Sequence, residues 1–131
     1  MQTMIINQVS VFIENRKGRL ADVTKLLAEN GINLRAVSVA DTADFGILRL
    51  IADRPQDVAA VLAANNVTAT LTEVISVPLG DRPGDLAKKL AVLSENGVAV
   101  EYLYAYLSAG SDGAVVVMRV DDTAKAEKLI G

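Results

Sequence analysis

The sequence has no cysteine, no histidine and no tryptophan, and each absence excludes a class of site. Without cysteine there is no disulfide framework, thiol redox motif, iron–sulfur site or thiolate zinc site. Without histidine there is no serine–histidine or cysteine–histidine catalytic machinery and no usual proton shuttle near neutral pH. We therefore expect no metal site and no cofactor, and acid–base chemistry would fall to Asp, Glu, Lys or Tyr.

Positive charge and long apolar runs are also scarce. The formal net charge is −3, whereas proteins that bind nucleic acid usually carry a basic excess. No segment approaches the ~18 apolar residues that a membrane-spanning helix needs. The first seven residues lack the basic region and the long apolar run of a signal peptide. These features favour a cytoplasmic protein that binds neither nucleic acid nor membrane.

A repeat with an offset of 66 residues organises the 131-residue chain. Arg16-Lys17-Gly18-Arg19-Leu20-Ala21 recurs as Arg82-Pro83-Gly84-Asp85-Leu86-Ala87. Between positions 16 and 35, eight of twenty residues match their counterparts, including Glu29, Asn30 and Gly31. An apolar pattern alone would not match Arg, Glu, Asn and Gly in register. We interpret the chain as two small units, residues 1–73 and 74–131.

Each unit follows the same order of predicted elements. In the first, alternating β-rich runs at 8–13, 33–40, 46–51 and 67–73 predict strands, and helices are expected at 20–29 and 56–64. This is the βαββαβ order of the ferredoxin-like motif. The second unit repeats it with strands at 74–79, 99–107 and 114–120 and helices at 85–96 and 123–130. It ends before a fourth strand, which truncation, a missing edge strand or a partner's strand would each explain.

The duplicated loop between strand and helix is the main candidate for chemistry. Backbone N–H groups at a helix N-terminus are unpaired and favour a carboxylate, and glycine lets a ligand approach closely. Asn15 or Asp81, just before each loop, suits an ammonium or amide group. The alternative is that the loops have a structural role alone, in which the glycines shape a turn and Arg16 and Arg82 are solvated surface charges.

These residues resemble a known family. The run from Asn15 to Leu20, with Asn30-Gly31-Ile32-Asn33-Leu34 after the helix, resembles an ACT domain, and residues 81–86 with 95–98 resemble a second. The resemblance implies an α+β fold of two ferredoxin-like units side by side, forming one continuous antiparallel sheet with helices on one face. It also implies that domains pair edge to edge through their second strands.

The resemblance implies function as well. ACT domains typically sense small molecules, most often amino acids, and regulate amino-acid metabolism without catalysis. Ligands bind between the glycine loop of one domain and the second strand of its neighbour. In serine-sensing members, asparagines hold the ligand at positions that match Asn15 and Asn33, whereas the second unit has Asp81 and Ala99. Residues implied in ligand binding are Asn15, Arg16, Lys17, Gly18, Arg19, Leu20, Asn33, Leu34, Asp81, Arg82, Pro83, Gly84, Asp85 and Leu86.

Three further features admit two interpretations. Alternation places four residues on one face of a strand: Val100, Tyr102, Tyr104 and Tyr106. This face is expected to be either an open, tyrosine-rich sheet face or an interface with another protein. Arg35 and Glu101 are repeat-equivalent and opposite in charge, so they would meet if the second strands paired, or be two exposed charges. Asp121-Asp122 is best explained by helix capping.

The sequence thus predicts a homodimeric regulatory protein that binds a free amino acid and acts on a metabolic enzyme or regulator in trans. One alternative is an interaction module that docks on an enzyme without a ligand. A small enzyme is disfavoured because no acid, base and nucleophile converge in the sequence.

Overall fold

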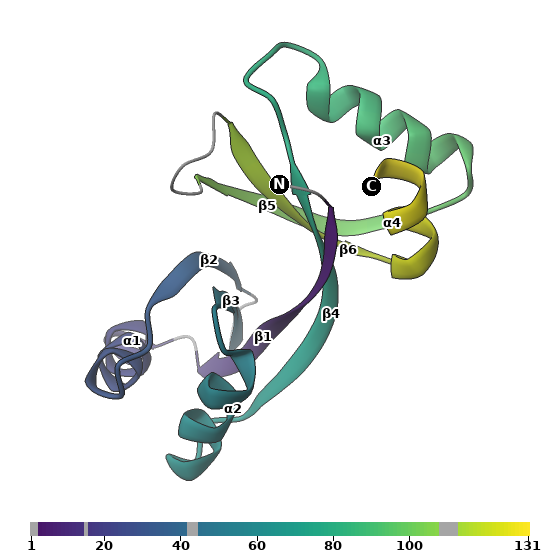
Figure 1. The fold of residues 1–131 in the computed structure, drawn as a ribbon. Coiled ribbons are helices and arrows are strands. Elements are labelled where there is room, and N and C mark those ends of the chain that lie inside the picture. Colours follow the sequence, from purple (N-terminus) through teal and green to yellow (C-terminus); the bar gives the residue numbers. More distant parts are fainter. Residues whose placement is uncertain (1–2, 15, 42–44, 108–112) are drawn as a thin grey trace. The chain divides into compact units, whose positions relative to one another are not determined.

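The computed structural model of the chain describes residues 3–14, 16–41, 45–107 and 113–131. Two compact units divide the chain, Asn7–Thr72 and a unit made of Met1–Ile6 with Glu73–Gly131 (Figure 1). The strands form a six-stranded sheet in the order β2-β3-β1-β4-β6-β5. The α+β, ferredoxin-like architecture is confirmed. The turn clusters of the sequence at 41–44 and 108–113 predict hairpin connections, and residues 42–44 and 108–112 of these lie outside the described residues.

The first six elements follow the predicted order, and the unit Asn7–Thr72 contains four of them whole together with most of the first and the beginning of the sixth. These six elements are β1 (Met4–Glu14), α1 (Arg19–Glu29), β2 (Leu34–Asp41), β3 (Phe45–Ala52), α2 (Pro55–Ala64) and β4 (Ala69–Pro78). Strand β3 pairs antiparallel with β1 and with β2. Helix α1 ends at Asn30-Gly31, where the φ of 72° at Gly31 is the left-handed conformation that glycine adopts without cost.

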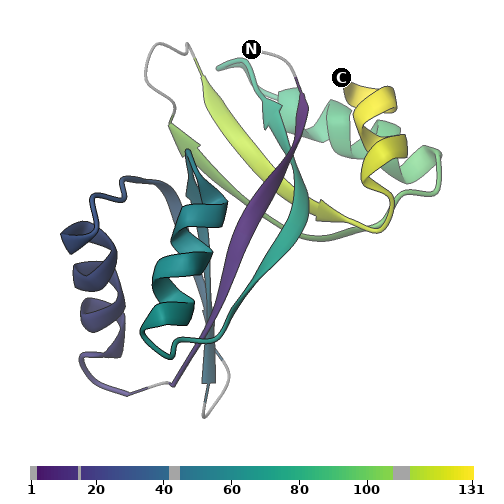
Figure 2. The same cartoon turned by 60° about the horizontal axis from the view of Figure 1, so that its bottom comes forward.

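Alternation along β1 separates two faces of this unit. Val9, Val11 and Ile13 point to the side of α1 and α2, which lie next to each other in Figure 2. They form a core with residues of β3, of both helices and of the segment between α2 and β4: Val23, Leu27, Leu48, Leu50, Val58, Leu62 and Val67.

Gln8 and Ser10 point to the opposite face, which we call the helix-free face. Gln8 is fully buried there and donates from Nε2 to Ser10 Oγ at 3.0 Å, and Ser10 Oγ lies 2.8 Å from Thr72 Oγ1.

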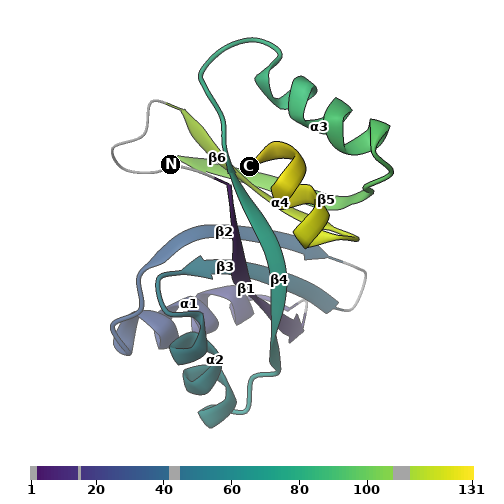
Figure 3. The same ribbon diagram turned by 45° about the vertical axis from the view of Figure 1, so that its right-hand side comes forward.

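The second unit begins within β4, which continues from the first unit without a break, in keeping with a run from Thr68 to Val77 that contains no glycine and no proline. It adds α3 (Asp85–Glu95), β5 (Val100–Leu107), β6 (Ala114–Val120) and α4 (Thr123–Ile130). Figure 3 shows α3 and α4 near each other in this unit. Their buried residues Leu93 and Ala126 join Ile75, Val77, Val116, Met118 and Val120 in a core.

The start of β1 occupies the place that the fourth strand has in a ferredoxin-like unit, next to the first strand of the second unit. In the sheet order β1 lies next to β4, and residues up to Ile6 belong to this unit. The Ile5 N–H donates to Glu127 Oε2 at 3.2 Å, and the buried Thr3 donates from Oγ1 to the Ile130 carbonyl at 3.1 Å. The chain's own N-terminal segment thus contacts α4.

Two expectations about the second strands are wrong. Strands β2 and β5 do not pair; they are the two outer strands of the sheet. Val100 does not share a face with the tyrosines either, because the register of β5 shifts between Val100 and Tyr102. Val100 packs on the core, whereas Tyr104 and Tyr106 lie opposite Val117 and Val115 on the other face.

The capping interpretation is confirmed for Asp122, whereas Asp121 has a different backbone partner. Asp122 is the N-cap of α4 and accepts from the Lys125 N–H at 3.0 Å. Asp121 accepts from the Ala99 N–H at 3.0 Å. Both carboxylates are therefore used by the backbone.

Candidate functional site

The first glycine loop is described except for Asn15, which lies outside the described residues. Gly18 precedes α1 with a φ of 82°, and no atom lies within 4 Å of the position of a Cβ there. The glycine is therefore required by its backbone angle, and the space beside it is open. Arg16 donates from Nε to Glu14 Oε2 at 3.2 Å, which fastens the loop to the end of β1. Lys17 and Leu20 are exposed.

Arg19 begins α1 and lines a cavity of about 210 Å³ beside this loop. Its Nε is buried and has no hydrogen-bond partner among the described residues. The other lining residues come from the ends of β1 and β3 and from the segment between α2 and β4: Phe12, Ile13, Glu14, Phe45, Asn66, Val67 and Thr68. The cavity thus combines a cation, exposed phenylalanine rings and backbone.

The second glycine loop has the same backbone and different side-chain contacts. Gly84 precedes α3 with a φ of 87° and has the same open space around its Cβ position. Asp85 accepts from the Gly80 N–H through Oδ2 at 2.6 Å. The Arg82 guanidinium lies beside Gly80, since a Cβ on that residue would be 3.4 Å from Arg82 Nε. Asp81 and Pro83 are exposed, and Leu86 packs on the core.

Asn33 and Leu34 lie at the opposite end of the first unit. Leu34 pairs with Ala52 at one end of β2, whereas Glu14, next to the loop, pairs with Phe45 at the other end of β3. Helix α1 separates the two places, and its 11 residues span about 16 Å. The structure therefore brings Arg16–Arg19 together but does not bring Asn33 to them within one unit.

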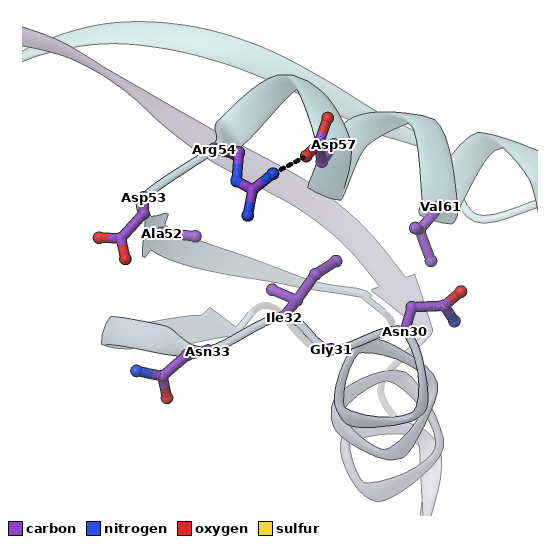
Figure 4. A pocket seen from close by; sticks show the side chains of 9 residues that line it. All are labelled: Asn30, Gly31, Ile32, Asn33, Ala52, Asp53, Arg54, Asp57 and Val61. Atoms are coloured by element: carbon purple, nitrogen blue, oxygen red, sulfur yellow. Dashed lines mark ion pairs between the residues drawn. The ribbon is translucent and has the colours of Figure 1, made fainter.

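Asn33 lines a second cavity, of about 220 Å³, between the α1–β2 and β3–α2 connections (Figure 4). Ile32 and Val61 give it an apolar part, and Arg54 points toward Asp57 with an Nη1–Oδ2 distance of 3.7 Å. Asn30, Gly31, Ala52 and Asp53 complete the lining. Sequence reasoning found Asn33 through the resemblance, but nothing in the repeat marked Arg54 or Asp57.

An ion pair stands beside this cavity and has a counterpart in the other unit. Arg35 donates to Asp53 from Nε at 3.0 Å and from Nη2 at 2.8 Å, and this hydrogen bonding lowers the pKa of the Asp53 carboxyl. Arg119 donates to Glu101 from Nε at 3.0 Å. The expectation that Arg35 could meet Glu101 is therefore wrong, because Arg35 pairs with Asp53 just after β3, and Glu101 pairs with Arg119 of β6, each within its own unit.

The repeat offset would have found these pairs. Asp53 and Arg119 are 66 positions apart, as are Arg35 and Glu101, so both pairs occupy equivalent places with the charges exchanged. Among the described residues, no three His, Cys, Asp or Glu side chains gather to hold a metal ion. No helix in the described part of the chain is long and apolar enough to cross a membrane.

Comparison with solved structures supports the fold closely. Protein BT0572 from Bacteroides thetaiotaomicron is 38% identical, with a TM-score of 0.89 over 97% of this chain and 87% of that chain. The regulatory subunit of aspartate kinase from Thermus thermophilus is 18% identical, with a TM-score of 0.67 over 99% and 93%. That from Thermus flavus is 19% identical, with a TM-score of 0.62 over 99% and 95%.

At the level of sequence, no functionally curated protein matches the chain. The family model for the ACT domain pair, however, matches residues 4–131, which is nearly all of it. With both glycine loops and both ferredoxin-like units in place, the chain belongs to the ACT domain pair family.

Proposed function

We propose that this ACT domain pair is a cytoplasmic, non-enzymatic regulator of amino-acid metabolism that binds a free amino acid. The observation that carries the proposal is the duplicated glycine loop, in which Gly18 and Gly84 hold left-handed backbone beside open space. An unobstructed helix N-terminus suits a carboxylate. The regulatory part of the proposal is supported by the fold shared with structures named as regulatory subunits of aspartate kinase.

The ligand is proposed to lie between the glycine loop of one ACT unit and the second strand of a unit from another copy. Asn33 and the first loop are at opposite ends of one unit, so a ligand that touches both requires a second copy. The outer strands offer a place for pairing. Val37 and Val39 on β2 are each 48% exposed, and Leu107 on β5 is 85% exposed. An edge strand with exposed aliphatic side chains favours pairing with another chain. This supports a homodimer.

A bound ligand would regulate by favouring one arrangement of the units, to the extent that it binds that arrangement better. The output partner is proposed to be a metabolic enzyme or regulator acted on in trans. We take the amino-acid-binding units to be residues 1–73 and 74–131, with the second less suited to a serine-like ligand, since it has Asp81 and Ala99.

The alternative is a module that docks on an enzyme and binds no ligand. It is favoured by the tyrosines of β5, whose side chains are half-buried in a row on the helix-free face. Tyrosine is enriched at protein interfaces because it has an apolar ring and a polar tip. In that case the Tyr104→Ala variant would lose the partner, and Asn33→Ala would not.

Thermal-shift measurement with the twenty amino acids tests the main proposal. A ligand at 100 times its dissociation constant stabilises the folded state by ~2.7 kcal/mol. Asn33→Ala gives the first unit the residue that the second has, and we expect it to abolish the shift. Gln56→Ala, at an exposed position of the same unit, is the control. No shift with any amino acid, or catalytic turnover across a substrate panel, would refute the proposal.

A further inference from the structure

Arg19 and Asp85 hold equivalent places, 66 positions apart, as the first residues of α1 and α3. One is a cation and the other a carboxylate. The backbone around them is the same, since both follow a left-handed glycine. A difference in what the two loops bind would therefore come from these side chains.

Asp85 closes the second loop with its own carboxylate. Its Oδ2 accepts from the Gly80 N–H at 2.6 Å, the short distance of a charge-assisted hydrogen bond. The Arg82 guanidinium lies next to the same place. The second loop therefore already holds a carboxylate of its own, bonded to the Gly80 N–H beside the Arg82 cation, and this negative charge opposes the binding of a second carboxylate at the N-terminus of α3.

The first loop has Arg19 at the place of Asp85, and the carboxylate that lines its cavity belongs to Glu14 at the end of β1. Glu14, which stands where Gly80 does in the second loop, pairs with Arg16. Arg19 cannot accept a hydrogen bond, and its buried Nε finds no partner among the described residues. It faces a cavity of about 210 Å³ with Phe12 and Phe45 in its wall, 45% and 60% exposed.

The net charges of the two loops differ in the same sense. From Glu14 to Arg19 there are three basic side chains and one acidic side chain, which gives +2. From Gly80 to Asp85 there are one basic and two acidic side chains, which gives −1. An anion is attracted to the first loop and repelled from the second.

We propose that each chain takes one carboxylate ligand with an apolar body, at the first loop, and that Asp85 fills the second loop as an internal substitute for a ligand. This rests on the proposed function only in taking the glycine loops as binding elements. The ligand's carboxylate pairs with Arg19, and its apolar part lies against Phe12 and Phe45. In terms of amino acids, this selects one with an apolar side chain.

The test is a titration of the ¹⁵N-labelled whole chain, followed by amide NMR shifts, with sodium isovalerate as the probe. Isovaleramide, which has the same shape and no charge, is the control at constant ionic strength. We expect saturable shifts at residues 16–20 with isovalerate alone and none at 80–86. Equal responses of both loops, or no saturable response at the first, overturn the proposal without any variant.

Two variants, each of which replaces a charged group by a neutral amide, test the roles of the side chains. Arg19→Gln should weaken isovalerate binding about 10- to 150-fold, the effect of losing a hydrogen bond to a charged group. Asp85→Asn should make residues 80–86 respond, since it removes the internal carboxylate and its charge. The proposal is contradicted if Arg19→Gln binds isovalerate with unchanged affinity. It is also contradicted if Asp85→Asn keeps the dispersed spectrum of a folded protein and residues 80–86 still show no shift with isovalerate.

The result separates this inference from the proposed function. Isovalerate bound at the first loop with no amino acid bound anywhere would retain the asymmetry and reject amino-acid sensing. An amino acid that shifts both loops equally would retain sensing and reject the asymmetry.

Discussion

In the unit Asn7–Thr72 an arginine follows the glycine before the first helix, whereas an aspartate stands there in the other unit. The same exchange of sign occurs in two ion pairs of the outer strands. Arg35 on outer strand β2 pairs with Asp53, and Glu101 on outer strand β5 pairs with Arg119. In these ion pairs, both repeat-equivalent positions carry a charge in each unit, but the outer strand carries the positive charge in the first unit and the negative charge in the second.

Backbone geometry, in contrast, is the same in both units. Gly31 and Gly97 end α1 and α3 with φ angles of 72° and 76°, and the glycines before these helices also agree. A side chain at such angles is strained, so these positions tolerate little change. The comparison teaches that two units with the same backbone can differ in the sign of charge at equivalent positions, both in the glycine loops and on the outer strands.

The helix-free faces differ in polarity. Gln8 of the first unit is buried in a hydrogen-bonded chain with Ser10 and Thr72, and its equivalent in the second unit is the buried Val74. The next strand over carries tyrosines in the second unit where the first has Ala36, Ser38 and Ala40. The second face is thus the more apolar and aromatic of the two.

The largest expected effect is on the matched cores. Leu27 and Leu93 are repeat-equivalent and fully buried, so Leu27→Ala and Leu93→Ala should each cost about 2–5 kcal/mol in unfolding free energy. All three tyrosines lie in β5, so their fluorescence reports the second unit while circular dichroism reports both. Because β4 contributes to both units, we expect Leu27→Ala to move the tyrosine transition as well.

Urea unfolding with both probes checks this, with Leu20→Ala, at a 42% exposed position, as the control. A tyrosine transition that stays in place in Leu27→Ala would show that the two units unfold independently.

A smaller effect is expected on the helix-free faces. Ser10→Ala removes the hydroxyl that accepts from Gln8 Nε2 in a fully buried place, which should cost about 1–3 kcal/mol. Ser76→Ala, the repeat-equivalent change at a half-buried position beside Val74, should cost less. Chemical denaturation of both variants measures the difference in unfolding free energy. Equal losses would show that the hydrogen bonds of Gln8, Ser10 and Thr72 do not make the first unit more sensitive to this change than the second.

Much of the fold was predictable because the determining signals are local. Period-2 runs and helical spacing predict the strands and helices, and a repeat doubles the evidence at each, as with the glycines that end α1 and α3. The first loop was also predictable, since Gly18 and its neighbours are adjacent in sequence.

The remaining features depend on contacts between distant residues. Thr3 meets Ile130, 127 positions away, so local periodicity could not place the start of β1 in the second unit. The shift of register after Val100 depends on pairing with β6, and strict alternation misplaced that residue. The cavity beside Arg19 draws on four separate segments, of which the loop alone was recognised.

The contact between the N-terminal segment and α4 gives the next prediction. Thr3→Val keeps the shape but loses the hydrogen bond to the Ile130 carbonyl, at a cost of about 1 kcal/mol. Hydrogen exchange should then speed up in α4 and stay unchanged in α2. Faster exchange in both helices, or in neither, would contradict the role assigned to this segment.

The smallest effect is expected at the exposed ion pairs. Arg35 lowers the pKa of Asp53, so the pair stabilises the folded state above the carboxyl's ordinary pKa, and this contribution is lost as pH falls through the lowered value. Arg35→Gln should move the pKa of Asp53 up toward its ordinary value, as carboxyl NMR titration would record. Arg119→Gln is the matched control in the other unit and should leave the titration of Asp53 where it is. If Asp53 titrates identically in Arg35→Gln and in the native chain, the pair does not hold its charge in solution, and the reversed pairs of the two units are alike in contributing little.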